Sequence, residues 1–468
     1  MVIWKKLELP SEKLDTFSPS LNIRVFDNTK LGHKSLIGVH EIKSLREFEV
    51  QCNSEEGKQE DRTGDIRQAT GAKGKSPAGT TRKDQESEDH ELFDWWSKYY
   101  ASKELAATKA SEEEASSSHE SEQLTEHTKK YIERGYDTLT ILASALEDMP
   151  QFRGRNDFVS TFPLRKGKTK SAKDEDDTIV GQFKGTFRIL NDPNSNHQSL
   201  STLHLPSRKP VDCVVRVYVV RGIQLQPKDR DGLADPYLIV SLGKKSQGKR
   251  SEHKVKTLNP EFGRVFEFRV KIPLVKNLKI QVKDYDFPPD PDDLIGETEI
   301  DLEQRLLSRY HATCGLPKTY FKSGPFQWRD TLTPFQLLAK HCIRTGQKMR
   351  LDKGTPEKIH IGDDSYPLED SGTEESSNPE IEERLQCLAL QILNSFKLVP
   401  EHVETRPLFS KVRPDIEQGK LEMWVDIFSE EDEEFLSHVE NLITGGKIKL
   451  FNDNDSDNDN DGQSDSDN

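Results

Sequence analysis

The sequence predicts a mainly β protein with one complete antiparallel β-sandwich, helical segments and long disordered linkers. Three observations predict this class. Between residues 211 and 302, short runs alternate apolar and polar side chains, as Val215, Val217 and Val219 do, and this period is typical of half-buried strands. Turn signals separate the runs at intervals of roughly 8–12 residues, as in a sandwich. Only 32% of the 468 residues are hydrophobic and 32% are charged, so much of the chain lacks the side chains to form a core.

Composition excludes several classes of protein. The formal net charge is −15, and no basic face with base-reading elements is evident, so we expect no nucleic-acid partner. The five cysteines are scattered and none forms a CxxC pair, which favours reduced thiols over disulfides or a zinc site. The chain opens without an apolar run typical of a signal peptide. No run of about 18 apolar residues could span a membrane.

Residues 1–50 predict the last strands of a further sandwich. Leu21, Ile23 and Val25 alternate with polar residues, which indicates a half-buried strand. After a turn the apolar pattern resumes, and the whole unit has the shape of the later segment 280–296. We therefore expect a partial sandwich here, with sheet edges that need covering.

Residues 51–178 predict a linker that contains two amphipathic helices, over 92–100 and 131–149. The rest of the linker is rich in Gly, Ser, Lys and Glu, which indicates disorder. The first helix either docks on a neighbouring domain or lies in a membrane interface. It is short and lacks a basic polar face, which favours docking. Its apolar side chains, spaced as on one helical face, are Leu92, Trp95, Trp96 and Tyr99.

The remaining chain divides into four predicted segments. Residues 179–330 form the complete sandwich domain, which opens with a strand at Ile179. Residues 331–420 form a helical and linker segment, because Thr333-Pro334 is typical of an N-cap followed by proline. Residues 421–428 alternate like the first strand of another sandwich, and residues 429–468 form a disordered acidic tail.

Two acidic loops of the sandwich predict a metal site. Each lies between strand-like runs, so both loops can meet at one end of the sandwich. Calcium takes six to eight oxygen ligands from carboxylates and carbonyls, and carboxylates held together without a cation repel one another. The alternative is that these aspartates only form turns, which explains one or two per loop but not this many. The candidate calcium ligands are Asp229 and Asp235 in the first loop and Asp284, Asp286, Asp292 and Asp293 in the second.

The spacing of these residues resembles that of calcium-binding C2 domains. The first loop ends in Asp235-Pro236-Tyr237, and the second ends in Leu294-Ile295-Gly296-Glu297. The resemblance implies that the loop aspartates coordinate Ca²⁺. It leaves open whether the last ligand is Asp292, which keeps the usual step from Asp286, or Asp293, which directly precedes Leu294.

Longer strings resemble the ferlin family, nearest its dysferlin-like and myoferlin-like members. The resemblance implies a C-terminal-region fragment of a tail-anchored protein with several C2 domains, on the cytoplasmic side of membranes. Residues 1–50 would then be the end of one C2 domain, without calcium because Thr29 and Ser35 stand at ligand positions. Residues 421–428 would be the first strand of a truncated C2 domain. The strings are Leu92–Tyr100, Cys314–Pro317, Gln327–Asp330 and Leu398–Glu404.

The function expected from loops and resemblance together is calcium-dependent binding to anionic phospholipid membranes. Bound calcium reverses the sign of the loops, and Leu233 and Phe287 at the loop tips are candidates for insertion among lipid headgroups. Phe287 folded back onto the sandwich is the alternative. A basic run also lies close in sequence and either contacts anionic lipid or forms a solvated sheet edge. Its candidate membrane-contact residues are Lys244, Lys245, Lys249 and Arg250.

A second hypothesis is a calcium-independent scaffold that binds protein partners. The ferlin resemblance implies membrane fusion, vesicle trafficking and plasma membrane repair as processes, and membrane-trafficking proteins as partners. An enzyme is not expected, because the sequence contains no GxSxG, no phosphate-binding glycine loop with GK[ST] and no HExxH.

Overall fold

The structure is a computed structural model whose described residues form two compact units. One unit comprises Met1–Thr331 and Leu390–Glu430, and the other Leu332–Ala389 and Glu431–Asn468. The predicted disordered segments fall largely outside the described residues. The described residues are 20–28, 34–43, 49–50, 93–114, 124–149, 160–166, 179–185, 189–190, 209–287, 291–308, 310–351, 358–367, 378–410, 412–430, 435, 437 and 439.

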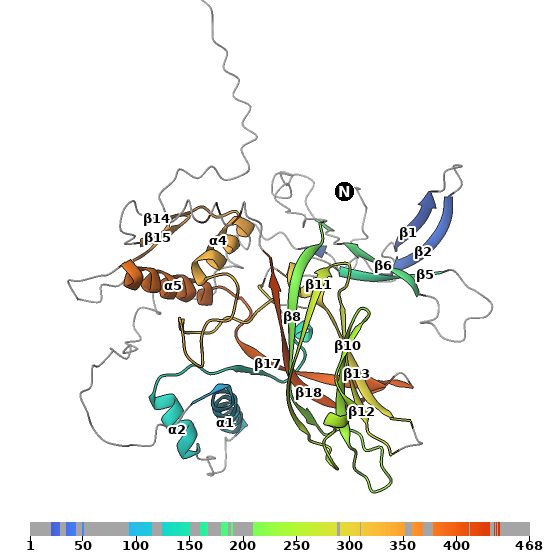
Figure 1. Ribbon diagram of the computed structural model, residues 1–468. Coiled ribbons are helices and arrows are strands. Elements are labelled where there is room, and N and C mark those ends of the chain that lie inside the picture. The colour runs from blue at the N-terminus through green and yellow to red at the C-terminus, as the bar shows by residue number, and fades with distance from the viewer. Residues whose placement is uncertain are drawn as a thin grey trace, which may run out of the picture. The chain divides into compact units, whose positions relative to one another are not determined.

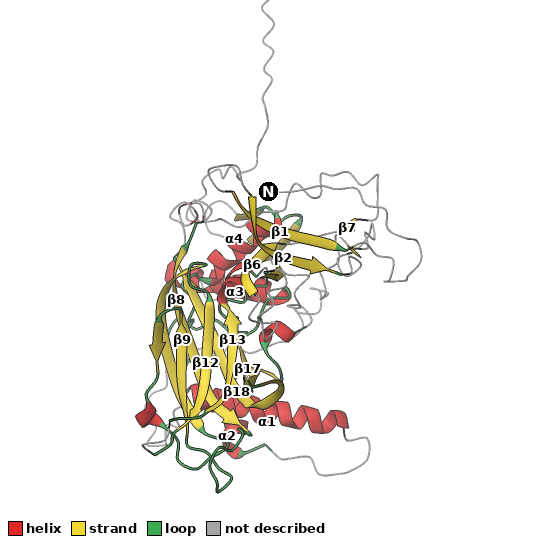
Figure 2. Ribbon diagram, turned by 90° about the vertical axis from the view of Figure 1, so that its right-hand side faces the viewer, coloured by secondary structure: helices red, strands yellow, loops and turns green. Residues whose placement is uncertain are grey.

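The first unit contains the sandwich, whose strands all lie in one continuous sheet path (Figures 1 and 2). The path runs β10-β9-β12-β13-β17-β18-β8-β11. It folds into two four-stranded halves that join where β13 meets β17, at the pair Glu297 and Phe409. The strands are β8 (Val211–Ile223), β9 (Pro236–Leu242), β10 (Lys245–Gln247), β11 (Glu261–Ile272), β12 (Asn277–Asp284), β13 (Leu294–Asp301), β17 (His402–Ser410) and β18 (Arg413–Ser429).

The core lies between the two halves, and the alternating pattern of the sequence forms it. Val215, Val217 and Val219 of β8 are buried, and they pack in one cluster with Ile280 of β12 and Ile295 of β13. Burying one such side chain contributes roughly 1.5–3 kcal/mol. The mainly β prediction and the antiparallel sandwich are therefore confirmed.

One end of the sandwich, called the loop end below, gathers the acidic loops. β12 ends there and β9 begins there, because Asp284 pairs with Pro236. Segments 224–235, 248–260 and 285–293 connect strands at this end. The turns at 243–244 and 273–276 lie at the opposite end, because Leu278 pairs with Leu242.

The predicted boundaries of the sandwich domain are wrong at both ends. The strand at 421–428 does not open a truncated domain: it is the inner part of β18, which pairs with β8 over its length and sends Leu421, Met423 and Val425 into the same core. β6 (Ile179–Gly185) belongs to another sheet, so the sandwich begins at Val211. Two strands that complete the fold are distant in sequence, and their apolar pattern alone could not assign them to it.

Of the two helices predicted between 51 and 178, the structure contains the first and not the second. Helix α1 (Trp95–Glu114) docks on the sandwich, with the Trp95 ring stacked on Trp424 of β18 at 4.8 Å between centroids. The helix expected over 131–149 is wrong. Helix α2 (Glu126–Glu133) stops before Gly135, which has a positive φ of 75°. The chain then forms β4 (Thr140–Leu142), parallel to β17, and a 3-10 helix at Leu146–Asp148.

The N-terminal residues form a smaller sheet. Its order is β1-β2-β5-β6, with β1 (Leu21–Asn28) and β2 (Lys34–Ile42) as an antiparallel hairpin. β5 (Ser160–Arg165) and β6 follow, and a separate parallel pair joins β3 (Glu49–Val50) to β7 (Ile189–Leu190). The two strands predicted within 1–50 are confirmed. That this sheet is the end of a C2 domain stays a prediction.

The second unit has the order helix, three strands, helix. Helix α4 (Pro334–Thr345) starts at the predicted cap, where Thr333 and Gln336 form a capping box. The antiparallel sheet contains β14 (Met349–Leu351), β15 (Lys358–Ile361) and β16 (Asp364–Pro367). Helix α5 (Asn378–Ser395) begins in this unit and continues into the first. A short helix, α3 (Leu302–Leu307), follows β13 in the first unit. Among the described residues, no helix is long and apolar enough to cross a bilayer.

Candidate metal site

Three aspartates converge at the loop end. Asp229 comes from the loop after β8, Asp284 is the last residue of β12, and Asp286 lies two residues further along the chain. One carboxylate oxygen from each lies within 4.8 Å of the others. Three hard oxygen donors at this spacing suit calcium better than a soft metal.

Asp284 is the buried member of this cluster, with no exposed surface. Its Oδ1 accepts a hydrogen bond from the Asp235 backbone N–H at 2.5 Å, and its Oδ2 has no hydrogen-bond partner among the described residues. Burial, and then the charges of Asp229, Asp286 and Asp235, raise the pKa of Asp284 to about 6. A buried carboxylate oxygen without a partner, beside two further carboxylates, fits a cation ligand.

Asp229 and Asp235 share the same acidic field. Desolvation, and then the neighbouring charges of Asp235 and Asp231, raise the pKa of Asp229. Asp235 stands beside the cluster and is partly engaged, because its Oδ1 accepts a bond from the Lys256 backbone N–H at 2.5 Å. Asp235 is therefore next to the site, although its carboxylate is not one of the three that converge.

The two candidates for the last ligand differ sharply. Both oxygens of Asp292 accept bonds from Arg250, and Tyr237 donates to Oδ2 at 2.6 Å. Arg250 holds the pKa of Asp292 well below its usual range. Asp293 is exposed, and its backbone N–H donates to Oδ2 of Asp286 at 3.2 Å. Asp292 therefore has a structural role, and Asp293 is the candidate beside the cluster.

The predicted membrane-contact residues do not form one surface. Phe287 is 81% exposed at the loop end, so it is not folded back, whereas Leu233 is half-buried. Lys244 and Lys245 lie at the opposite end, next to the turn after β9. The β9–β10 hairpin separates these lysines from the rest of the basic run.

The remaining basic residues behave differently from one another. Lys249 is exposed near the loop end, while Arg250 forms an ion pair with Asp292. Sequence reasoning missed Val255, which is 68% exposed in the segment before β11. Its backbone neighbours anchor this segment, since Lys254 N–H donates to the Pro236 carbonyl and Thr257 N–H to the Ala234 carbonyl. The sequence pattern that could have indicated this exposed valine is Lys-Val-Lys at 254–256.

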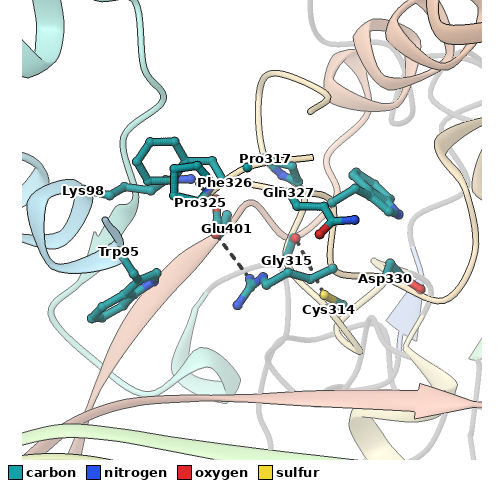
Figure 3. A pocket seen from close by; sticks show the side chains of 13 residues that line it. Trp95, Lys98, Cys314, Gly315, Pro317, Pro325, Phe326, Gln327, Asp330 and Glu401 are labelled. Carbon is teal, nitrogen blue, oxygen red and sulfur yellow. Dashed lines mark hydrogen bonds and ion pairs between the residues drawn. The ribbon is translucent and has the colours of Figure 1, made fainter. Parts of the chain in front are cut away.

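A cavity of about 280 Å³ lies between α1 and the segment that follows β13 (Figure 3). Residues from each of the four ferlin-like strings line the cavity, among them Lys98 of α1, Cys314, Arg329 and Glu401. The charges of the walls pair with one another: Lys98 and Arg329 both bind the Glu401 carboxylate. These strings therefore fasten α1 to the sandwich, and no feature of the cavity selects a ligand class.

A second group of buried charges lies further along β17. Glu404 has no exposed surface and accepts bonds from Arg305 at 2.7 Å and Arg406 at 3.1 Å. Glu147, from the 3-10 helix of the linker, binds the same two arginines. The arginine charges outweigh burial and lower the pKa of Glu404. This network joins the linker, α3 and β17.

Two family models match parts of the chain. A C2 domain model matches residues 213–316, and a model of the ferlin dsRNA-binding domain-like domain matches residues 307–398. The C2 match covers β8 to β13, and β17 and β18 follow the second match. The C2 sandwich is thus interrupted by a second domain, which the sequence analysis predicted as a helical and linker segment.

Relatives resemble the chain over most of its length. Myoferlin of Xenopus tropicalis is 38% identical over 440 residues, which are 91% of this chain and 21% of that protein. Human myoferlin is 37% identical over 446 residues, 91% of this chain and 20% of that protein. Mouse Fer-1-like protein 4 is 33% identical over 489 residues, 90% of this chain and 24% of that protein. The chain thus spans about a fifth of the length of these relatives.

Among solved structures, a C2 domain of plant extended synaptotagmin 1 aligns at 18% identity with a TM-score of 0.24, covering 48% of this chain and all of that domain. The C2 assignment rests instead on the family model and on the sandwich described above. With a C2 domain, a ferlin-specific domain and relatives that match 91% of its length, the chain belongs to the ferlin family.

Proposed function

We propose that the C2 domain of this chain binds anionic phospholipid membranes in a calcium-dependent manner. The observation that carries the proposal is the unpartnered, buried Oδ2 of Asp284 beside Asp229 and Asp286. These three carboxylates would hold the ion, with Asp235 and Asp293 beside them. Bound calcium would supply positive charge and open coordination positions for lipid phosphate or carboxylate oxygens.

The other residues of the loop end act on the lipid side. Without a cation, the acidic loops repel an anionic surface, and this repulsion keeps the protein off the membrane. Once the repulsion is removed, Phe287 can enter the headgroup region, and burial of such a side chain contributes roughly 1.5–3 kcal/mol. Lys249 and Lys254 are exposed in the segment between β10 and β11, which connects strands at the same end, and a basic residue near an anionic leaflet adds about 1 kcal/mol.

The cellular part of the proposal rests on what the ferlin resemblance implies. We infer that the whole protein acts on the cytoplasmic side of membranes, in fusion, vesicle trafficking or membrane repair, with membrane-trafficking proteins as partners. The absence of a nucleic-acid partner also stays a prediction. It is supported by the start of α5, Asn-Pro-Glu-Ile-Glu-Glu-Arg at 378–384, where three glutamates would repel phosphate.

Sedimentation with phosphatidylserine-containing vesicles, in calcium or in chelator, tests the proposal on the full chain. Calcium should increase the bound fraction of the wild-type chain strongly. Asp284→Asn combined with Asp286→Asn should remove this increase, because two of the three converging charges are lost. The matched control is Asp212→Asn with Asp363→Asn, which removes the same charge from one exposed site at the start of β8 and one exposed site in the second unit.

The competing function is a calcium-independent scaffold for protein partners. It predicts that calcium leaves vesicle binding unchanged and that the loop variants behave like the control. Either result would remove the calcium-dependent lipid function.

A further inference from the structure

The β17–β18 hairpin extends to the loop end of the sandwich. β18 pairs Lys420 with Ile223, the last residue of β8, so residues 413–419 run beyond the end of β8. The base of the hairpin is bonded to the first acidic loop, where Gln226 N–H donates to the Gln418 carbonyl at 3.1 Å. The hairpin tip therefore lies at the same end as the metal site, although none of the three converging aspartates belongs to it.

The tip presents an apolar side chain to solvent. Val412 is 86% exposed, more than Phe287 at 81%, and Ile416 further along the hairpin is 53% exposed. Arg413, which follows Val412, is exposed as well. In sequence, the tip reads Lys-Val-Arg at 411–413.

The same pattern occurs a second time at the loop end. Val255 is 68% exposed, with Lys254 and Lys256 on either side, both exposed. The ammonium of Lys256 binds Asp231 at 3.0 Å, which ties this tip to the first acidic loop. Two connections at the loop end thus each present one exposed valine next to an exposed basic residue.

We propose that the hairpin tip, Val412 with Arg413, is a further contact with anionic phospholipid, independent of the calcium ligands. An exposed valine beside an exposed arginine suits an interface in which the apolar side chain enters the headgroup boundary and the cation meets lipid phosphate. A protein partner would need a contiguous complementary surface of several hundred Å² on each side, whereas this tip is a narrow projection. The inference rests on the proposed lipid function and adds a second attachment point to it.

Val412→Glu tests the inference in the full chain, with phosphatidylserine-containing vesicles. The substitution removes the apolar contact and adds a negative charge, so vesicle affinity in calcium should fall about tenfold, which corresponds to ~1.4 kcal/mol. The matched control is Leu274→Glu, since Leu274 is 70% exposed in a turn at the opposite end. That variant should bind as the wild-type chain does.

Depth-dependent quenching by brominated lipids gives a second readout. Val412→Trp should gain quenching on vesicles over the wild-type chain, and Leu274→Trp should gain none. If the wild-type chain shows calcium-dependent binding but Val412→Glu binds like Leu274→Glu, the hairpin is not a lipid contact and its apolar tip serves another partner. If the wild-type chain does not bind vesicles, the proposed function itself fails, and the hairpin inference fails with it.

Discussion

The sandwich contains two carboxylate clusters, each with one fully buried member, and the charge of that member is balanced in one cluster but not in the other. At the loop end, Asp284 is buried beside Asp229 and Asp286, and no basic side chain among the described residues reaches its Oδ2. On β17, Glu404 is equally buried but lies between two arginines. The pKa of Asp284 is raised to about 6, whereas that of Glu404 is lowered.

This difference indicates that Glu404 has a structural role, whereas Asp284 is available to bind a cation. Where a carboxylate holds elements together, the chain supplies arginines from α3 and β17 to offset its burial. At the loop end, the three converging carboxylates repel one another, and among the described residues none of the three forms an ion pair with a lysine or an arginine. A site of this kind gains stability when a cation binds, so the comparison itself can be tested.

The largest expected effect is that of Glu404→Gln. The change leaves two buried arginines with Glu147 as their remaining anion. Breaking a buried ion pair by removing one partner costs about 3–5 kcal/mol. Urea unfolding of the variant, followed by tryptophan fluorescence, should show a loss of stability of this size with and without calcium.

Asp284→Asn is the counterpart in the other cluster. It keeps an oxygen for the Asp235 N–H and removes a charge that burial and repulsion disfavour. Without calcium, this variant should therefore be at least as stable as the wild-type chain, and calcium should no longer stabilise it. Equal losses of stability in the Glu404 and Asp284 variants would erase the distinction between the clusters.

The sequence predicted the sandwich well where strands follow one another closely. The alternation around Val215 and in 278–282 is local, and it survives in the structure as the core. β17 and β18 were not assigned because a whole domain separates them from β13, and local periodicity carries no information about strand partners. The helix predicted over 131–149 was wrong for a related reason. Leu139 and Leu142 have helical spacing, but Thr140–Leu142 pairs in parallel with β17, a strand that is distant in sequence.

The candidate site was predicted in its centre and not at its margins. Asp229, Asp284 and Asp286 converge because the loop after β8 and the end of β12 lie at the same end of the sandwich, as the two acidic loops between strand-like runs indicate. Asp292 was not separable from Asp293, because its pairing with Arg250 spans 42 positions of sequence. The hairpin tip at Val412 was out of reach, since its place at the loop end depends on the unassigned pairing of β18.

The next effect in size is the dependence of calcium affinity on pH. The folded pKa of Asp284 is about 6, above its ordinary value of 3.8, so the folded state holds this proton more tightly than the unfolded state does. Without calcium, stability therefore falls as pH rises between these two values. Calcium competes with the proton, so its affinity should be about tenfold weaker at about pH 5 than at neutral pH, as measured by calorimetric titration.

Asp229 should steepen this dependence, because its pKa is also raised. A calcium affinity that stays constant between about pH 5 and neutrality would mean that Asp284 does not hold the ion.

The smallest expected effect distinguishes Asp292 from Asp293. Both oxygens of Asp292 are bonded to Arg250, and Tyr237 adds a further bond, so Asp292→Asn should change calcium affinity less than about twofold. Asp293→Asn removes a charge beside Asp286 and should weaken calcium binding several-fold, since affinity follows the number of charged ligands. Titration of the two variants side by side checks the order. The reverse order would mean that calcium draws Asp292 away from Arg250, and the loop end would then share the arginine pairing that sets the β17 cluster apart.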